Sequence, residues 1–242
     1  MKTKYINEEG QQVPGVTTVL GVLNKPFLIP WANKLGLQGI DSSKYVDGLA
    51  EIGQVAHYLI LCHLTGEKPC LDDYSKNTID IAENSFLSFL QWEKSHVIRP
   101  LWVEKPLVSD RYGFGGTPDF VGTVDGEAEL MDFKTGKAIY PEYFYQMAAY
   151  RQLVTENFDT LRKDGVVFWP GFRSPTERGA FVLRRARVLR IGRTEDEGFE
   201  ERIVSHLDME FDMFQHCLAI YNLQKAILPR RAPVSGQSDQ SA

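Results

Sequence analysis

Two acids and a lysine interrupt an apolar stretch of the sequence, GGTPDFVGTVDGEAELMDFKTGK at residues 115–137. Side chains alternate along a β-strand, so Asp132 and Lys134 should point to the same face of it. Asp119 lies on the strand best placed to pair with theirs, across a glycine-containing turn. A buried carboxylate is costly unless a cation satisfies it. Two carboxylates that converge from paired strands therefore predict a hard, oxygen-rich site suited to Mg²⁺ or Mn²⁺.

Lys134 would place a positive charge beside these acids. It could stabilise a phosphate oxygen or act on a metal-activated water. An arbitrary Asp-x-Lys is more often a surface ion pair. The apolar neighbours Leu130, Met131 and Phe133 indicate a central strand here, and so favour a buried site.

These residues belong to motifs that resemble a known family. GTPD followed by DFK resembles the PD-(D/E)XK nuclease superfamily. Two further motifs resemble its RecB-like exonuclease branch: G-x-x-x-H, ending at His57, and Q-x-x-x-Y, ending at Tyr150. The motifs are specific together and weak singly. PGVTTVL, followed by Trp31, is also similar to the phage-type and mitochondrial genome maintenance exonucleases of this branch. The resemblance covers about residues 13–155.

The resemblance implies a metal-binding site. Asp119 and Asp132 would hold the divalent ion, with the Phe133 carbonyl as a further oxygen ligand and His57 as a nitrogen ligand. An imidazole ligand is more compatible with Mn²⁺ than with Mg²⁺. Taken alone, a histidine at the rim of an amphipathic helix, as His57 is, would more often be structural.

The resemblance also implies a catalytic set: Asp119, Asp132, Lys134, Gln146 and Tyr150. Lys134 would position the attacking water and stabilise charge that develops on the phosphate oxygens. Gln146 and Tyr150 lie one helical turn apart and share a face, so they could orient water, phosphate or Lys134. A tyrosine that packs with its hydroxyl at the surface remains the alternative for Tyr150.

Four residues are candidates for DNA contacts: Thr135, Arg151, Trp31 and Thr17. Thr135 could donate to a phosphate, and Trp31 could stack a splayed base. Arg151 directly follows the Q-x-x-x-Y motif, and Thr17 lies in PGVTTVL. The alternatives are a strand-end role for Thr135 and core packing for Trp31. The basic run RRARVLRIGR could follow a phosphate backbone, although a solvated strand face is the commoner explanation.

Helices and strands must position these residues. Helices are expected at 43–65, 77–95, 141 to about 155 and 196–227, with a short one capped by Thr17 or Thr18. Strands are expected at 101–109, 120–124, 128–134, 166–170 and 181–191. This order predicts an α/β (α+β) fold with a central mixed β-sheet flanked by helices and an N-terminal helical part.

The length and composition are sufficient for one packed core, since 43% of the 242 residues are hydrophobic. We expect a single nuclease domain over 1–228. It would comprise a mainly helical part (1–98), a sheet core with the active site (99–191) and a C-terminal helix (195–228). The polar tail 229–242 is expected to be disordered.

Composition also restricts the cofactors and the compartment. A net charge of −5 leaves DNA binding to local clusters. Three scattered cysteines argue against disulfides, and they do not match the four that bind an iron–sulfur cluster in several RecB-like nucleases. A nucleotide-binding P-loop motif is absent, so no bound nucleotide is expected. Without a secretory or membrane-spanning segment, we expect a cytoplasmic protein of a bacterial or phage-infected cell.

The resemblance implies a metal-dependent DNA exonuclease that hydrolyses phosphodiester bonds at single-stranded or frayed ends, in DNA recombination, repair or phage replication. One alternative is a structure-specific or restriction-type endonuclease on the same core. Another is a non-catalytic DNA-binding recombination protein. A single-strand annealing protein or a helicase would be a separate partner.

Overall fold

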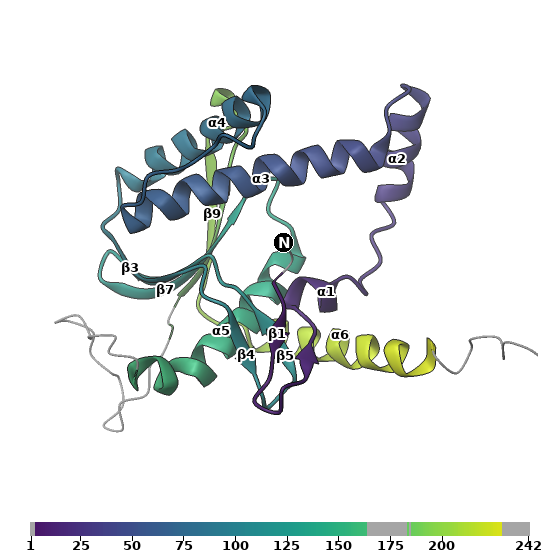
Figure 1. Cartoon of the computed structure of the whole chain (residues 1–242), viewed down its shortest axis with the longest axis vertical. Coiled ribbons are helices and arrows are strands. Elements are labelled where there is room, and N and C mark those ends of the chain that lie inside the picture. Colours follow the sequence, from purple (N-terminus) through teal and green to yellow (C-terminus); the bar gives the residue numbers. More distant parts are fainter. Residues whose placement is uncertain (1–2, 164–182, 184, 229–242) are drawn as a thin grey trace, which may run out of the picture.

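A five-stranded sheet lies at the centre of the computed structural model, which describes residues 3–163, 183 and 185–228 (Figure 1). Its strands, in spatial order, are β3 (Ile98–Val103), β6 (Phe120–Val124), β7 (Glu127–Lys134), β8 (Arg185–Ile191) and β9 (Phe199–Val204). β7 and β8 run parallel, and the other neighbouring pairs run antiparallel. The expected α+β fold with a central mixed sheet is thus confirmed.

Helices cover both faces of this sheet (Figure 1). The helices on one face are α3 (Ser42–Thr65) and α4 (Lys76–Glu93). The helices on the other are α5 (Pro141–Lys163), α6 (Asp208–Ile227) and the short α1 (Val16–Leu20). Among the helices of the described residues, none combines the length and the hydropathy that crossing a bilayer requires.

The alternation of side chains along β7 assigns each of its residues to one of two apolar cores. Met131 and Phe133 pack beneath α3 and α4, whereas Leu130 packs beneath α5. Asp132 and Lys134 follow Leu130 in the alternation and so face α5. The predicted shared face of the acid and the lysine is therefore present.

A tight turn joins β6 to β7. Asp125 and Gly126 occupy it with φ angles of 53° and 83°, as the two central residues of a type I′ hairpin turn require. The Asp125 carboxylate also accepts a hydrogen bond of 2.8 Å from the Val97 amide. This turn sets the register in which Phe120 lies opposite Met131.

The predicted helix boundaries reflect recognisable caps. Asp41 accepts hydrogen bonds from two amides in the first turn of α3, and Gly66 ends this helix with φ of 75°. Ser75 caps α4 in the same way through the Thr78 amide. Pro141 is the first residue of α5, as predicted, although this helix continues to Lys163.

Three sequence-based expectations were wrong. The strand expected at 101–109 is two strands, because Glu104 has φ of 48° and turns the chain. After it, β4 (Leu107–Ser109) pairs with β5 (Phe114–Gly116) in a separate small sheet. The helix expected at 196–227 is a 3₁₀ turn, the strand β9 and then α6. Gly15 precedes α1, so neither Thr17 nor Thr18 caps it.

Two further elements lie near the chain start. The first is a hairpin of β1 (Tyr5–Ile6) and β2 (Gln12–Val13). The second is α2 (Leu28–Leu37), which none of the predicted helices included; Pro30 lies in its first turn, where proline is tolerated. The expected strand at 166–170, the start of that at 181–191 and the tail at 229–242 fall outside the described residues.

Candidate active site

The two carboxylates occupy different surroundings on the β6–β7 hairpin. Asp119 lies directly before β6, and its Oδ2 accepts a hydrogen bond of 2.7 Å from the Phe133 amide. Asp132 is only 1% exposed, and its Oδ1 accepts a hydrogen bond of 3.1 Å from the Gln146 side chain. One acid is thus fixed by the backbone of the neighbouring strand and the other by the helix that covers the sheet.

Gln146 connects the polar groups on the α5 side of the sheet. Its amide nitrogen donates to Asp132 and, at 2.9 Å, to the Tyr150 hydroxyl, while its Oε1 accepts from Lys134 Nζ at 3.1 Å. Lys134 Nζ also lies 2.6 Å from Asp132 Oδ2. Gly116 makes room for this arrangement, since a Cβ there would lie 2.6 Å from the Tyr150 ring. The acid, the lysine and the Q-x-x-x-Y pair form one connected network.

His57 reaches the same region from α3, on the other side of the sheet. Its Nδ1 lies 3.6 Å from Asp119 Oδ1, and its ring packs edge-on against Phe133. Gly53, one turn earlier, permits this approach, because a Cβ there would lie 3.2 Å from Thr135 Oγ1. The glycine of the G-x-x-x-H motif therefore lets α3 lie close to the end of β7.

The charges of these groups depend on one another. Burial and the neighbouring Asp119 raise the pKa of Asp132 to about 6, although Lys134 opposes the shift. Burial would also raise the pKa of Asp119, but His57, Lys134 and the Phe133 amide lower it overall. Burial would lower the pKa values of His57 and Lys134, yet the adjacent carboxylates raise both. The lysine is therefore cationic at neutral pH.

Glu104 is a third carboxylate near the site, and the sequence interpretation did not include it. Burial raises its pKa, and the negative charge of Asp119 raises it further. The Glu104 amide donates to the Asp119 carbonyl at 3.1 Å. The sequence did offer one sign of a site residue here: in WVEKP, a single acid follows the apolar residues at the end of the strand. It was passed over because the strand was expected to continue through this position.

The donor atoms have the chemistry that a divalent cation prefers. Asp132 Oδ2 is buried and lies close to Lys134 Nζ, but without the geometry of a hydrogen bond. A carboxylate oxygen left in this state beside a second carboxylate fits Mg²⁺ or Mn²⁺. In the described part of the chain, no three His, Cys, Asp or Glu side chains form a complete metal site. Metal binding therefore remains a prediction supported by the donor types.

The affinity for Mn²⁺ is expected to fall by at least tenfold per pH unit below pH about 6, since a proton on His57 competes as well. A metal ligand must be deprotonated, and protons compete for Asp132 below its pKa of about 6. Calorimetric titration of the wild type from pH 5 to pH 8 measures this dependence. Asp132→Asn should bind Mn²⁺ more weakly and with a flatter pH profile. Equal wild-type affinity at pH 5 and pH 8 would contradict the assignment of Asp132.

The structure brings one of the four candidate DNA contacts to the network. Thr135 follows Lys134, and its hydroxyl accepts a hydrogen bond of 3.2 Å from Arg193. Arg151 instead pairs with Asp208 at 2.8 Å, at the start of α6. Trp31 lies on α2, where its ring contacts that of Tyr45.

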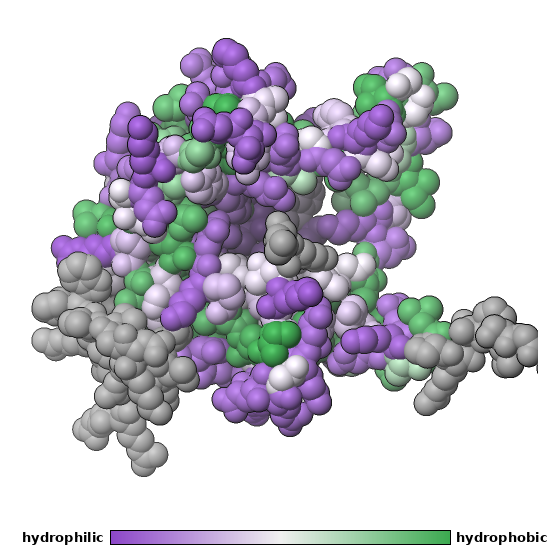
Figure 2. Space-filling view, in the orientation of Figure 1, coloured by the Kyte–Doolittle hydropathy of each residue, from purple (hydrophilic) through white to green (hydrophobic). Residues whose placement is uncertain are grey.

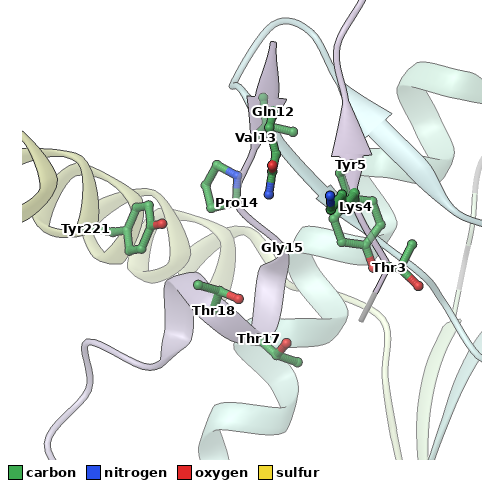
Figure 3. Close-up of a pocket in the computed structure, with 10 residues that line it drawn as sticks. All are labelled: Thr3, Lys4, Tyr5, Gln12, Val13, Pro14, Gly15, Thr17, Thr18 and Tyr221. Carbon is green, nitrogen blue, oxygen red and sulfur yellow. The ribbon is translucent and has the colours of Figure 1, made fainter. Parts of the chain in front are cut away.

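Thr17, the fourth candidate, lines a cavity of about 480 Å³ that also includes Lys4, Tyr5 and Tyr221 (Figure 3). The Tyr5 ring lies where Gly15 and Gly115 have no side chains, since a Cβ on Gly115 would lie 2.3 Å from it. The Tyr5 hydroxyl is 3.0 Å from Thr117 Oγ1. Tyr5 thus lines this cavity and contacts, through Thr117, the segment that carries Asp119.

Comparisons with known proteins agree with this geometry at the level of the family. The model of the PD-(D/E)XK nuclease superfamily matches residues 47–222. The sequence has no significant match among curated proteins.

Several solved structures are similar to the chain. A candidate exonuclease from Eubacterium rectale is 12% identical, with a TM-score of 0.43 over 74% of this chain and 68% of its own. LHK-Exo in complex with dAMP is 12% identical, with a TM-score of 0.32 over 76% and 90%. The alkaline exonuclease LHK-Exo from Laribacter hongkongensis is 14% identical, with a TM-score of 0.26 over 73% and 86%. TM-scores this low support no particular activity.

Proposed function

Because the chain belongs to the PD-(D/E)XK nuclease superfamily, we propose that it is a metal-dependent DNA exonuclease acting at single-stranded or frayed ends. One observation carries the proposal: the buried Asp132 carboxylate lies between Lys134 and Gln146, beside a second carboxylate that the Phe133 amide holds. A charged cluster of this kind, buried at the end of a central strand, is costly for the fold and suits a catalytic site.

Asp119 and Asp132 would hold Mg²⁺ or Mn²⁺, with His57 and the Phe133 carbonyl as further ligands. When bound, the cation would supply Lewis-acid chemistry to the scissile phosphate. Lys134 would orient the attacking water and stabilise the charge that develops on the phosphate oxygens. Gln146 would hold Lys134 and Asp132 at a fixed separation, and Tyr150 would fix the Gln146 amide in turn. In-line hydrolysis would leave 5′-phosphorylated products.

Linear and circular single strands distinguish an exonuclease from an endonuclease on the same core. With Mg²⁺ or Mn²⁺, we expect the protein to degrade a linear single strand and to leave a covalently closed single-stranded circle intact. Denaturing gels of end-labelled and internally labelled DNA measure both reactions, and a chelator should stop the first. Cleavage of the circle would establish an endonuclease. Binding of DNA without cleavage of either substrate would favour a non-catalytic recombination protein.

The biological setting belongs to the same proposal. Removal of nucleotides from DNA ends suits recombination, repair or phage replication in the cytoplasm of a bacterial or phage-infected cell. A helicase or a single-strand annealing protein would then be a separate chain that supplies or receives the single strand.

A further inference from the structure

Aromatic side chains lead from Lys134 along the start of α5 towards α2. The Lys134 ammonium lies 4.9 Å from the centroid of the Tyr143 ring, within the range of a cation–π contact. The centroids of the Tyr143 and Tyr140 rings are 5.7 Å apart. The Phe27 ring lies within 10° of parallel to that of Tyr140, at a centroid distance of 6.5 Å. We call Tyr143, Tyr140 and Phe27 the aromatic path.

The outer part of the aromatic path is open to solvent. Phe27 is 55% exposed and Tyr140 is 36% exposed, and neither belongs to the apolar cores beneath the helices. The neighbouring helix α2 buries none of its residues. Figure 2 shows apolar side chains at the surface where α2 stands away from the sheet. Contiguous exposed rings and aliphatic side chains mark a binding surface more often than a structural one.

A second cation lies at the inner end of the aromatic path. Arg193 donates through Nη2 to Thr135, and its buried Nε has no hydrogen-bond partner among the described residues. The Tyr143 and Tyr45 side chains lie within electrostatic range of this guanidinium. Arg193 as a whole is only partly buried and lies beside Thr135, so its guanidinium group suits an oxygen of a phosphodiester backbone.

We propose that the aromatic path binds unpaired bases of a single-stranded DNA end while the backbone passes Arg193 and enters the site at Lys134. This inference rests on the proposed function and specifies the form of its substrate. Aromatic rings stack on any base, whatever the sequence. The bases of a duplex are stacked on one another, so they do not offer their faces to Phe27 or Tyr140. The aromatic path therefore favours single strands over duplex.

The position of the aromatic path favours a nucleic acid over a protein partner. The path is continuous with Lys134 through the Tyr143 ring. A folded partner seated on Tyr140 and Phe27 would lie beside Tyr143, the ring that contacts Lys134. A flexible single strand can occupy the same rings and still present its phosphate to the site.

Phe27→Ala and Tyr140→Ala test the proposal. Fluorescence anisotropy with a labelled oligothymidylate, in Ca²⁺ to prevent cleavage, should show about tenfold weaker binding for each variant, a loss of about 1.4 kcal/mol from one stacked base. Binding of a blunt duplex of the same length should change less than twofold. Tyr140→Phe and Phe27→Trp keep a ring at each position and should retain wild-type affinity. Leu37→Ala, an exposed apolar truncation at the other end of α2, is the matched control.

Three results would overturn the inference. The first is wild-type affinity for the single strand in both alanine variants. The second is an equal loss for single strand and duplex. The third is a wild-type dimer, detected by sedimentation, that dissociates in Phe27→Ala while single-strand affinity is unchanged, which would assign the rings to a contact between copies. In all three, wild-type cleavage of DNA would leave the proposed function standing. If the wild type neither binds nor cleaves DNA, both fail.

Discussion

Lys134→Met is expected to lower the rate of DNA cleavage by about 10³-fold, the effect of removing a charge that stabilises the transition state. The ammonium lies between Asp132 Oδ2 and Gln146 Oε1, so the substitution removes the positive charge at the centre of the network. Asp132→Asn should have an effect at least as large, because it removes an anionic ligand and keeps the side-chain volume. Single-turnover cleavage of an end-labelled single strand in Mn²⁺ measures both.

Two controls separate catalysis from folding and binding. Lys137→Met removes an exposed lysine from the same segment and should cleave at the wild-type rate. Asp132→Asn should bind DNA in Ca²⁺ nearly as tightly as the wild type. Its thermal midpoint at pH 8 in chelator should not fall, because burial and Asp119 disfavour the charged form that the variant eliminates. Near-wild-type cleavage in either active-site variant would refute the site.

Arg187→Met is expected to lower the free energy of unfolding by about 3–5 kcal/mol, the cost of leaving a buried carboxylate unpaired. Arg187 is 2% exposed on β8, and its guanidinium donates through Nε and Nη2 to Glu129 on β7, which is fully buried. Its Nη1 contacts Glu201 on β9, and its guanidinium lies 5.2 Å from the Trp92 ring centroid. One side chain thus connects three strands and α4. Urea denaturation at pH 7 measures the loss.

A double variant and a surface variant control this experiment. Glu129→Met combined with Arg187→Met should recover most of the lost stability, because two packed neutral side chains replace the charged pair. Arg202→Met is the surface variant, on the neighbouring strand β9. The Arg202 side chain is 60% exposed and lies 3.9 Å from Glu200. This variant should change stability by less than about 1 kcal/mol. If Arg187→Met lowers the free energy of unfolding no more than Arg202→Met does, the buried pair contributes little to stability.

The predictable parts of the fold and site depend on local signals. Asp125-Gly126 specifies a two-residue turn, and the alternation in ELMDFK then fixes which side chains face α5. Gly66 and Pro141 mark helix ends through backbone preferences of single residues. The motif spacing places Gln146 and Tyr150 on one face, and the hydrogen bonds of Gln146 with Asp132 and Lys134 follow from that face meeting β7.

The missed parts depend on tertiary contacts. β9 has the sequence FEERIV, whose charged residues resemble an exposed helix, but pairing with β8 makes it an edge strand. Glu104 was missed because its φ of 48° breaks a stretch that composition describes as one strand. The DNA contacts of Trp31 and Thr17 stay predictions: Trp31 lies on α2, which buries none of its residues, and Thr17 lines a cavity whose lining includes none of the catalytic residues.

The two-residue turn between β6 and β7 has a consequence for the order of folding. Asp119, Asp132 and Lys134 belong to one local hairpin, which can form within microseconds, and α5 can dock on it afterwards through contacts such as that of Gln146 with Asp132. The shift of the Asp132 pKa to about 6 arises from burial, so it appears only when α5 docks. At pH 5 the docking of α5 is coupled to protonation of Asp132. The stability that this protonation contributes is lost as the pH rises through about 6. The acidity of a single carboxyl group thus reports whether α5 has docked.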